Sequence, residues 1–244
     1  MKLPLSNTLE VFVNHSKLDG LKILHLSDLH INKNTTIDTI QTLITTCKEL
    51  EYDFAVITGD IIDCKVHYIQ KKLQLLNTLA SKKPVYYISG NHDIFYGLEN
   101  LKEELIDFNF MDNTTTIFEF NDYKINITGL ADRFSKLFKV PRDEQKVLNF
   151  LQNSEATIFL AHQPKDYKLA VKTNTALFLC GHTHGGQIFP FHYLVRLVQP
   201  FLSGLFYQDK TAIYVNKGLG TWGIDFRYKA DSEITILKLN HNTK

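Results

Sequence analysis

Two histidines one residue apart, His182 and His184, follow an apolar run at residues 175–180 and are flanked by glycines. In an extended chain the side chains of residues i and i+2 point the same way, so both imidazoles can face one point beyond the strand end. Imidazole is a common ligand for transition metals. A His-Thr-His turn by itself is more often an ordinary polar loop, so a metal site needs support from the rest of the chain.

That support comes from other short apolar runs that end in ligand-type residues. The candidates are Asp28 and His30 after residues 21–26, Asp60 after 54–57, Asn91 after 85–88, and His162 after 157–161. Because open α/β sheets gather their sites at the carboxyl ends of strands, we expect these side chains to converge. Carboxylate, amide and imidazole ligands without thiolate suit two divalent ions, manganese first and iron or zinc as alternatives. Asp60, at a tight Gly-Asp turn, is the candidate for the carboxylate shared between the ions.

Each signal also has an ordinary structural explanation. Asp-x-His occurs by chance in many proteins, Gly-Asp and Gly-Asn are common turn pairs, and a single histidine after a strand is more often a hydrogen-bonded one. Their shared position at strand ends favours one dinuclear site. Cys180 beside the histidines is interpreted as a small buried apolar residue.

The elements that must position these residues alternate between strand and helix in the first half of the chain. Apolar residues recur at helical spacing over residues 37–50, 66–80 and 98–108, which predicts an α/β core with parallel strands. The second half contains more strand: a hairpin at 115–120 and 123–128 with a turn at 121–122, a short helix over 141–151, and strands at 212–215 and 234–239. We therefore predict two stacked mixed β-sheets flanked by helices, an α/β (α+β) sandwich, in one domain spanning residues 1–244.

Composition limits the classes of partner. The 244 residues are 44% hydrophobic and carry a formal net charge of +1, which argues against binding nucleic acid through general basicity. The three cysteines, an odd number without disulfide-scaffold spacing, suit a reducing compartment. No uninterrupted apolar run is long enough to cross a bilayer. The expectation is a cytoplasmic protein that contacts the inner face of the membrane peripherally.

Five blocks of this sequence resemble the signature of the calcineurin-like metallophosphoesterases. The blocks are Asp28-x-His30, Gly59-Asp60-x-x-Asp63, Gly90-Asn91-His92-Asp93, His162 and Gly181-His182-x-His184. The resemblance implies a β-sandwich flanked by helices and hydrolysis of phosphoesters at two metals. It also implies that Asp28, His30 and His184 hold one ion, that Asn91, His162 and His182 hold the other, and that Asp60 is shared.

The same resemblance assigns His92 to the chemistry instead of to a metal. His92 would lie beside the substrate phosphate and protonate the leaving oxygen, with Asp93 orienting its ring and Asp63 supporting the site from behind. Two cations lower the pKa of a bridging water, so that hydroxide forms near neutral pH and attacks phosphorus. A histidine that titrates near neutrality can then give a proton to the departing group.

Two stretches bear on the substrate. Residues 188–207 are apolar and contain no acidic residue, and they are either core or an interfacial surface at the mouth of the site. Residues 133–142 interleave basic and apolar side chains, and are either an ordinary solvated loop or a patch for anionic lipid headgroups or an acylated substrate. Arg227, Arg196 and Tyr207 are the candidates for contact with substrate.

Within the family, later blocks resemble a bacterial subgroup that includes UDP-2,3-diacylglucosamine pyrophosphatases of lipid A synthesis. These blocks are His162-Gln163-Pro164, residues 181–187, residues 215–221, Arg227 and Glu233-Ile234. The first hypothesis is therefore a pyrophosphatase acting on an acylated nucleotide sugar at the membrane. The alternative is a soluble phosphodiesterase or phosphatase for small phosphoesters, with residues 188–207 serving as core. A non-catalytic binding module would be expected to lack ligands, and all seven candidates are present.

Overall fold

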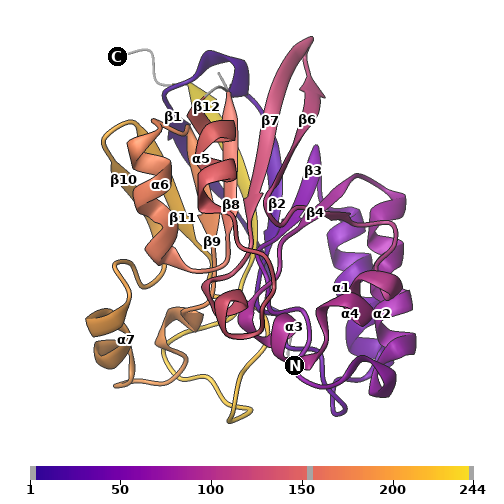
Figure 1. The fold of residues 1–244 in the computed structure, drawn as a ribbon. Helices are drawn as coiled ribbons and strands as arrows, with labels where there is room; N and C mark the ends of the chain where they lie inside the picture. The colour runs from indigo at the N-terminus through magenta and orange to yellow at the C-terminus, as the bar shows by residue number, and fades with distance from the viewer. Residues whose placement is uncertain (1–3, 153–155, 242–244) are drawn as a thin grey trace.

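The computed structural model describes residues 4–152 and 156–241 and contains two stacked six-stranded sheets with helices outside them (Figure 1). The first sheet has the order β1 (Ser6–Val13), β12 (Ile234–His241), β2 (Lys22–Leu26), β3 (Phe54–Ile57), β4 (Val85–Tyr87), β5 (Asn109–Phe110). The second has the order β10 (Gly204–Gln208), β11 (Thr211–Val215), β9 (Leu177–Cys180), β8 (Thr157–Ala161), β7 (Tyr123–Leu130), β6 (Thr114–Phe120). The predicted architecture of two mixed sheets is confirmed.

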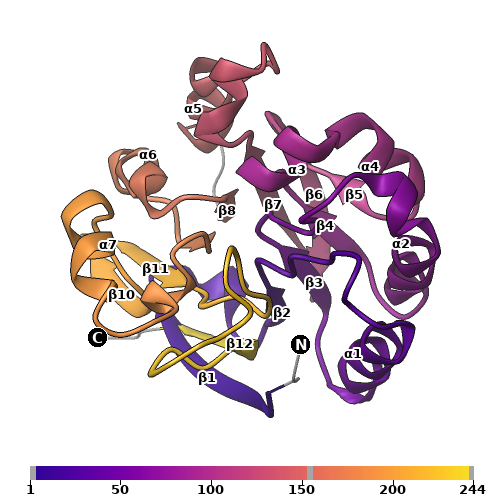
Figure 2. The same cartoon turned by 90° about the horizontal axis from the view of Figure 1, so that it is seen from below.

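Parallel pairing brings the strand ends of interest to one edge. Strands β2, β3, β4 and β5 run parallel, as do β7, β8, β9 and β11, while β12, β6 and β10 pair antiparallel with their neighbours β2, β7 and β11. The sheets meet at this edge, where the His162 ring after β8 bonds the carbonyl of Thr58 after β3. The loops that follow these strands lie at the lower end in Figure 1 and face the viewer in Figure 2.

Helices cover the outer face of each sheet. Helices α1 (Ile37–Glu49), α2 (Gln70–Asn77) and α4 (Leu98–Glu104) pack on the first sheet, and α5 (Glu144–Gln152) and α6 (Tyr167–Lys172) pack on the second. Two more helices, α3 (Asn91–Tyr96) and α7 (His192–Val198), lie at the loop end. Short 3₁₀ turns lie at Ser16–Leu18, Val66–Tyr68, Thr78–Ser81, Arg133–Leu137, Pro164–Asp166 and His184–Gly186. The helix predicted over residues 66–80 is thus a 3₁₀ turn, α2 and a second 3₁₀ turn.

The strands read as continuous apolar runs because both of their faces are buried. In β2, Ile23 points between the sheets and Leu24 points toward the helices; in β3, Val56 and Ile57 do the same. Such strands lack the alternation of a half-exposed sheet, as parallel strands covered on both sides do. This two-sided burial fixes the strand ends, and with them the loops that carry the candidate ligands.

The apolar segment 188–207 has a mixed structure. None of the residues of α7 is buried, whereas Gln199 is, and β10 forms an edge strand beside β11. The segment is therefore an exposed helix followed by an edge strand, so of the two alternatives the one in which it belongs wholly to the core is excluded. In the part of the chain that the structure describes, no helix is long and apolar enough to cross a membrane.

Candidate metal centre

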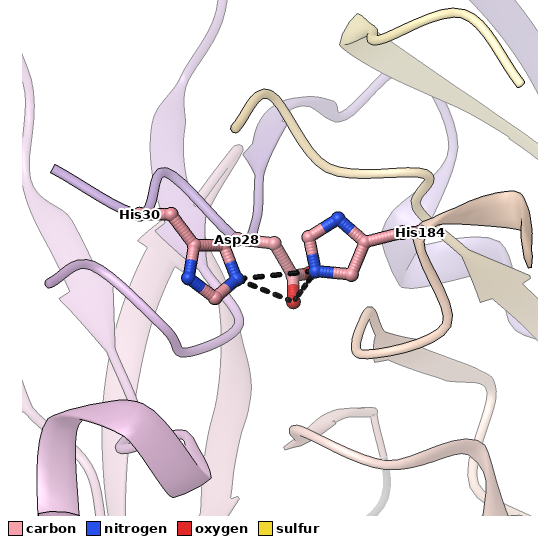
Figure 3. A group of neighbouring side chains, drawn as sticks. All are labelled: Asp28, His30 and His184. Carbon is pink, nitrogen blue, oxygen red and sulfur yellow. Dashed lines mark hydrogen bonds and ion pairs between the residues drawn. The ribbon is translucent and has the colours of Figure 1, made fainter. Parts of the chain in front are cut away.

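The first group of candidate ligands comprises Asp28, His30 and His184 (Figure 3). Nε2 of His30 lies 3.1 Å from Nε2 of His184, and Oδ1 of Asp28 lies 3.3 Å from the latter nitrogen. Ligand atoms bound to one transition-metal ion at about 2.1 Å are separated from their neighbours by roughly 3 Å. Oδ1 of Asp28 is buried and has no hydrogen-bond partner. Because a buried polar atom normally has a partner, this cluster fits a cation.

The second group comprises Asp60, His162 and His182, with Asn91 beside them. Nε2 of His162 lies 3.1 Å from Nδ1 of His182 and 3.1 Å from Oδ1 of Asn91. The other ring nitrogen of His162 lies 2.7 Å from the carbonyl oxygen of Thr58 and donates to it. That bond fixes the tautomer in which Nε2 offers a lone pair to an ion.

Asp60 faces both groups. Its Oδ2 lies 3.7 Å from Nε2 of His30 and 3.4 Å from Nε2 of His162, while Oδ1 accepts the backbone N–H of His92 at 2.8 Å. A single carboxylate oxygen is thus aimed at two histidines from different groups. This is the arrangement that a bridging carboxylate requires.

Most of the candidate ligands sit on strained backbone. Five of the seven, Asp28, His30, Asp60, His182 and His184, have φ between +46° and +72°. Non-glycine residues seldom adopt this left-handed conformation, and such positions cost of order 1 kcal/mol or more each. Two backbone bonds in the same direction hold the first two turns together, from Asp28 N–H to Gly59 O and from His30 N–H to Asp60 O, both at 3.0 Å. The fold therefore turns these side chains inward against their local preference.

Burial and neighbouring charges set the protonation states of several candidate ligands. Burial and the nearby His184 ring lower the pKa of His30 to about 3, and burial with His162 lowers the pKa of His182 to about 4. Burial would raise the pKa of Asp28, but the surrounding histidines hold it well below its ordinary value. At neutral pH His30 and His182 are therefore neutral and Asp28 is ionised, the protonation states that bind metal. His162 differs: burial lowers its pKa, but the charges of Asp60 and Asp28 outweigh burial and raise that pKa well above its ordinary value, so a cation that binds there displaces a proton.

Glycines leave room for the ligands. A Cβ on Gly181 would overlap Oγ of Ser27 and Oδ2 of Asp28, and one on Gly90 would overlap Oδ1 of Asp60. Neither glycine has a positive φ, so the constraint at these two positions is the close approach of a ligand to the backbone.

Replacing Gly181 with alanine should therefore displace Asp28 and lower metal content. We expect Gly181→Ala to bind fewer ions per chain, by elemental analysis, and to lose hydrolytic activity in parallel. Gly223→Ala is a control for space alone, because no atom lies within 4 Å of the added Cβ; its φ of +70° strains an alanine, so it should cost stability but no bound metal. A Gly181→Ala protein with full metal content would contradict the steric explanation.

His92 pairs with Asp63, and the expectation that Asp93 orients its ring is wrong. Nδ1 of His92 lies 2.7 Å from Oδ1 of Asp63, which leaves Nε2 free for a substrate. Burial lowers the pKa of His92, but the bond to Asp63 and the charges of Asp60 and Asp93 outweigh it and raise that pKa above its ordinary value. The ring also lies near His30 and Asp60, a third close group.

Asp93 has a different contact set. Its carboxylate is fully buried and accepts backbone N–H groups of Asp60 at 2.8 Å, Ile61 at 2.8 Å, Ile62 at 3.1 Å and Gly90 at 2.9 Å. Burial and the negative charge of Asp60 raise the pKa of Asp93 to about 7. Asp93 thus clamps the turn that carries Asp60 onto the start of α3, and it does not contact the reacting side of His92.

None of the three residues expected to contact substrate lines the cavity that contains His92, although Arg227 lines another cavity of about 630 Å³ together with His30. Nη2 of Arg227 lies 3.1 Å from Nδ1 of His184, and the guanidinium donates to backbone carbonyls, including that of Lys217 at 2.9 Å, so it supports a ligand from behind. The hydroxyl of Tyr207 accepts the N–H of Phe12. Tyr207 pairs with Ala212 in β11, whereas Gly204, at the other end of β10, pairs with Val215 at the end of β11 that leads into the loops of the site. Arg196 lines a separate cavity described below.

A cavity of about 250 Å³ opens onto the two groups. It is lined by Asp60, Asn91, His92, His182, Thr183, His184, Val195, Val198, Gln199 and Trp222. Sequence reasoning missed Trp222, which no motif marks. It reaches the site because the buried side chain of Gln187 bonds the backbone of Trp222 and Ile224. The geometry can therefore hold two cations beside a histidine with one free ring nitrogen.

Comparison with known families matches this geometry. A family model described as calcineurin-like phosphoesterase matches residues 21–186. Uncharacterized metallophosphoesterases of Helicobacter pylori and Campylobacter jejuni are each 36% identical to this chain, over 91% and 98% of it. A Danio rerio protein described as a transmembrane protein with a metallophosphoesterase domain is 32% identical over 91% of the chain. The chain spans only 61%, 64% and 54% of the lengths of these three relatives.

Solved structures share the fold at low sequence identity. The NAD nucleotidase of Haemophilus influenzae superposes with a TM-score of 0.56 at 19% identity, covering 81% of this chain and 45% of that one. A 5'-nucleotidase precursor from Thermus thermophilus gives a TM-score of 0.53 at 13% identity, covering 89% and 54%. These likenesses concern the architecture of two sheets with flanking helices.

Proposed function

The chain belongs to the calcineurin-like phosphoesterase family, and from this premise we propose that it hydrolyses phosphoesters with two divalent metal ions. The observation that carries the proposal is the position of Asp60, whose Oδ2 faces a histidine of each group, His30 at 3.7 Å and His162 at 3.4 Å. Asp28, His30 and His184 would hold one ion, and Asn91, His162 and His182 the other, with Asp60 shared.

When bound, the ions supply a water of lowered pKa and neutralise the charge on the phosphoryl group. The chain's own residues do the remaining work. His92 holds a proton at Nε2 for the departing oxygen, while Asp63 fixes the ring through Nδ1. Asp93 holds the Asp60 turn in place, and Arg227 holds the ring of His184. The metal identity is a prediction, with manganese first and iron or zinc as alternatives.

Small phosphoesters are the substrate class that we propose first. The cavity at the metal groups is about 250 Å³ and has polar walls on one side, at Asn91 and His92. That volume admits a phosphoryl group with a compact organic substituent. The uncharacterized relatives add no narrower assignment.

An acylated nucleotide sugar, UDP-2,3-diacylglucosamine, is the second candidate substrate. One observation favours it: Val195, Val198 and Trp222 form an apolar wall of the cavity, and the last two are 60% and 57% exposed. Acyl chains could lie along such a wall without facing water. Peripheral contact with the inner face of a membrane and a cytoplasmic location accompany this candidate as predictions.

Manganese-dependent turnover of two substrates distinguishes the candidates. We expect hydrolysis of a generic aryl phosphodiester, with chelation by EDTA abolishing it and added Mn²⁺ restoring it. Release of UMP from UDP-2,3-diacylglucosamine with no activity on soluble esters would replace the first substrate class by the second. Absence of metal-dependent hydrolysis of either substrate would contradict the proposed function.

A further inference from the structure

A second cavity lies beside the metal-binding turn and has a different chemical character. It measures about 270 Å³ and is bordered by Gly185, which follows the candidate ligand His184. The side chains of His192, Arg196, Lys217 and Lys229 line it. None of the seven candidate metal ligands lines this cavity. The cavity is therefore distinct from the metal pocket although the two share one loop.

The cavity carries positive charge with little compensation. No acidic residue lines it within the part of the chain described. Nζ of Lys217 lies 3.6 Å from Oε2 of Glu233, whereas no salt bridge or side-chain hydrogen bond is found for Arg196 among the described residues. Nζ of Lys229 lies 4.7 Å from the centre of the Phe189 ring. Cationic groups left without carboxylates around a cavity favour an anion there.

Helix α7 separates this cavity from the metal pocket. His192 and Arg196, four residues apart, face the cationic cavity, and Val195, Val198 and Gln199 face the metals. The third side of α7 is exposed to solvent, where the side chains of Tyr193, Leu194 and Leu197 are 59%, 58% and 81% exposed. In Figure 2, α7 lies beside the loop that precedes β12, drawn in yellow. Backbone bonds from Phe189 N–H to Tyr228 O and from Tyr228 N–H to Gln187 O join the two segments.

These two segments also carry exposed apolar side chains, here called the α7 surface. Apart from Val198 and Trp222, which line the metal pocket, its members are Phe189, Phe191, Tyr193, Leu194, Leu197, Ile224, Phe226 and Tyr228. A soluble protein seldom exposes so many large apolar side chains together without a partner. Aromatic residues interleaved with lysine and arginine are typical of surfaces that enter the interfacial layer of a membrane.

We propose that the cationic cavity binds the phosphate headgroup of an anionic phospholipid, while the α7 surface enters the adjoining acyl region. The two features occur together, since Phe189 and Tyr228 belong to the α7 surface and also line the cavity. A phosphate fits a cavity of about 270 Å³, and Arg196 and Lys229, for which no salt bridge is found among the described residues, supply positive charge, with Lys217 beside them shared with Glu233. This docking is independent of the phosphoesterase activity, because it uses neither the metal ligands nor His92.

Vesicle co-sedimentation of the full chain tests this docking. We expect binding to vesicles that contain phosphatidylglycerol and little binding to pure phosphatidylcholine. Arg196→Gln combined with Lys229→Gln should weaken binding to the anionic vesicles on the order of 30-fold, since each cation near such a surface contributes about fivefold. Leu194→Ser combined with Leu197→Ser should also weaken it. Lys71→Gln combined with Lys124→Gln, two exposed lysines elsewhere, should leave it unchanged.

Titration with inorganic phosphate separates the lipid from the free anion. Binding of phosphate together with anionic vesicles, both lost in the Arg196/Lys229 double variant, would support the proposal. Binding of phosphate without vesicle binding, or equal binding to both kinds of vesicle, would overturn it. Thermal melting of each variant controls for folding. If vesicle binding persists in a chain without hydrolytic activity, the proposed function fails and the docking stands.

Discussion

Replacing His92 with alanine is expected to lower kcat by about 10²–10⁴-fold while the chain keeps both metal ions. The reason is geometric: Asp63 occupies Nδ1 of the ring at 2.7 Å, so Nε2 is the nitrogen left to give up a proton, and His92 lines the cavity. Removing the ring removes this proton donor. It leaves unchanged the first group of ligands, Asp28, His30 and His184, and the second group, Asp60, His162 and His182. Steady-state kinetics with elemental analysis of the same preparation measures both quantities.

Asp63→Asn is a milder second variant, which keeps the ring of His92 and changes only its hydrogen-bond partner. It keeps the shape of the side chain but removes the charge that raises the pKa of His92. Since His92 must be protonated to act as an acid, activity falls as the pH rises through its pKa. Because Asp63→Asn lowers the pKa of His92, we expect the decline of activity with rising pH to begin at a lower pH than in the unaltered chain. We also expect a smaller loss of kcat than in His92→Ala. If His92→Ala instead loses an ion, the ring is a ligand in the group with His30 and Asp60.

Asp60→Asn is expected to reduce the binding of both ions, by more than about 100-fold in affinity. Losses of 10–100-fold are typical for residues that act behind the ligands, and a shared ligand should exceed them. The amide can still accept the N–H of His92 through Oδ1, so the substitution isolates the bridging oxygen. Competition with a chelator of known affinity measures the change for each ion.

Asp122→Asn is the matched control for this substitution. Asp122 has φ +65° in the turn between β6 and β7, close to the +54° of Asp60, and asparagine tolerates both conformations. Its metal affinities should equal those of the unaltered chain. Loss of only one ion in Asp60→Asn would mean that Asp60 serves one group and does not bridge.

The positions of the candidate ligands could be predicted because the sequence marks strand ends clearly. Short apolar runs at residues 21–26, 54–57 and 157–161 are followed within three residues by a carboxylate or an imidazole, and the structure brings these ends together. A buried parallel strand is mostly apolar, with the buried His25 of β2 as an exception, so its end lies close to the change of composition. The two groups of candidate ligands, the one with Asp28 and the one with Asp60, could therefore be predicted from the ends of the strands.

The partner of His92 could not be predicted from spacing along the chain. Asp93 is its neighbour in sequence, but consecutive residues of a helix point about 100° apart, so the start of α3 sends the two side chains to different sides. Asp63 reaches His92 from the loop after β3. This contact depends on how two loops pack, which no local pattern encodes.

Strand β1 and helix α7 escaped prediction for related reasons. Strand β1 is half-exposed and alternates too weakly to identify, and it gains its place by pairing with β12 from the far end of the chain. The apolar segment that contains α7 has the composition of a core but exposes Leu197 and its neighbours. Composition measures apolar content, and it does not reveal which side of a helix lacks a covering layer.

The left-handed backbone at five of the seven ligand positions has a consequence for the protein's persistence in the cell. Before a cation binds, the folded chain carries this backbone strain without the stability that metal binding adds, so its folded state is weakest at that stage. Metal supply would then govern survival against proteases as well as turnover, because a ligand that binds only the native form adds to its stability. Variants that exchange His30 or His182 for glycine would give up hydrolysis and tolerate heat better in the absence of metal.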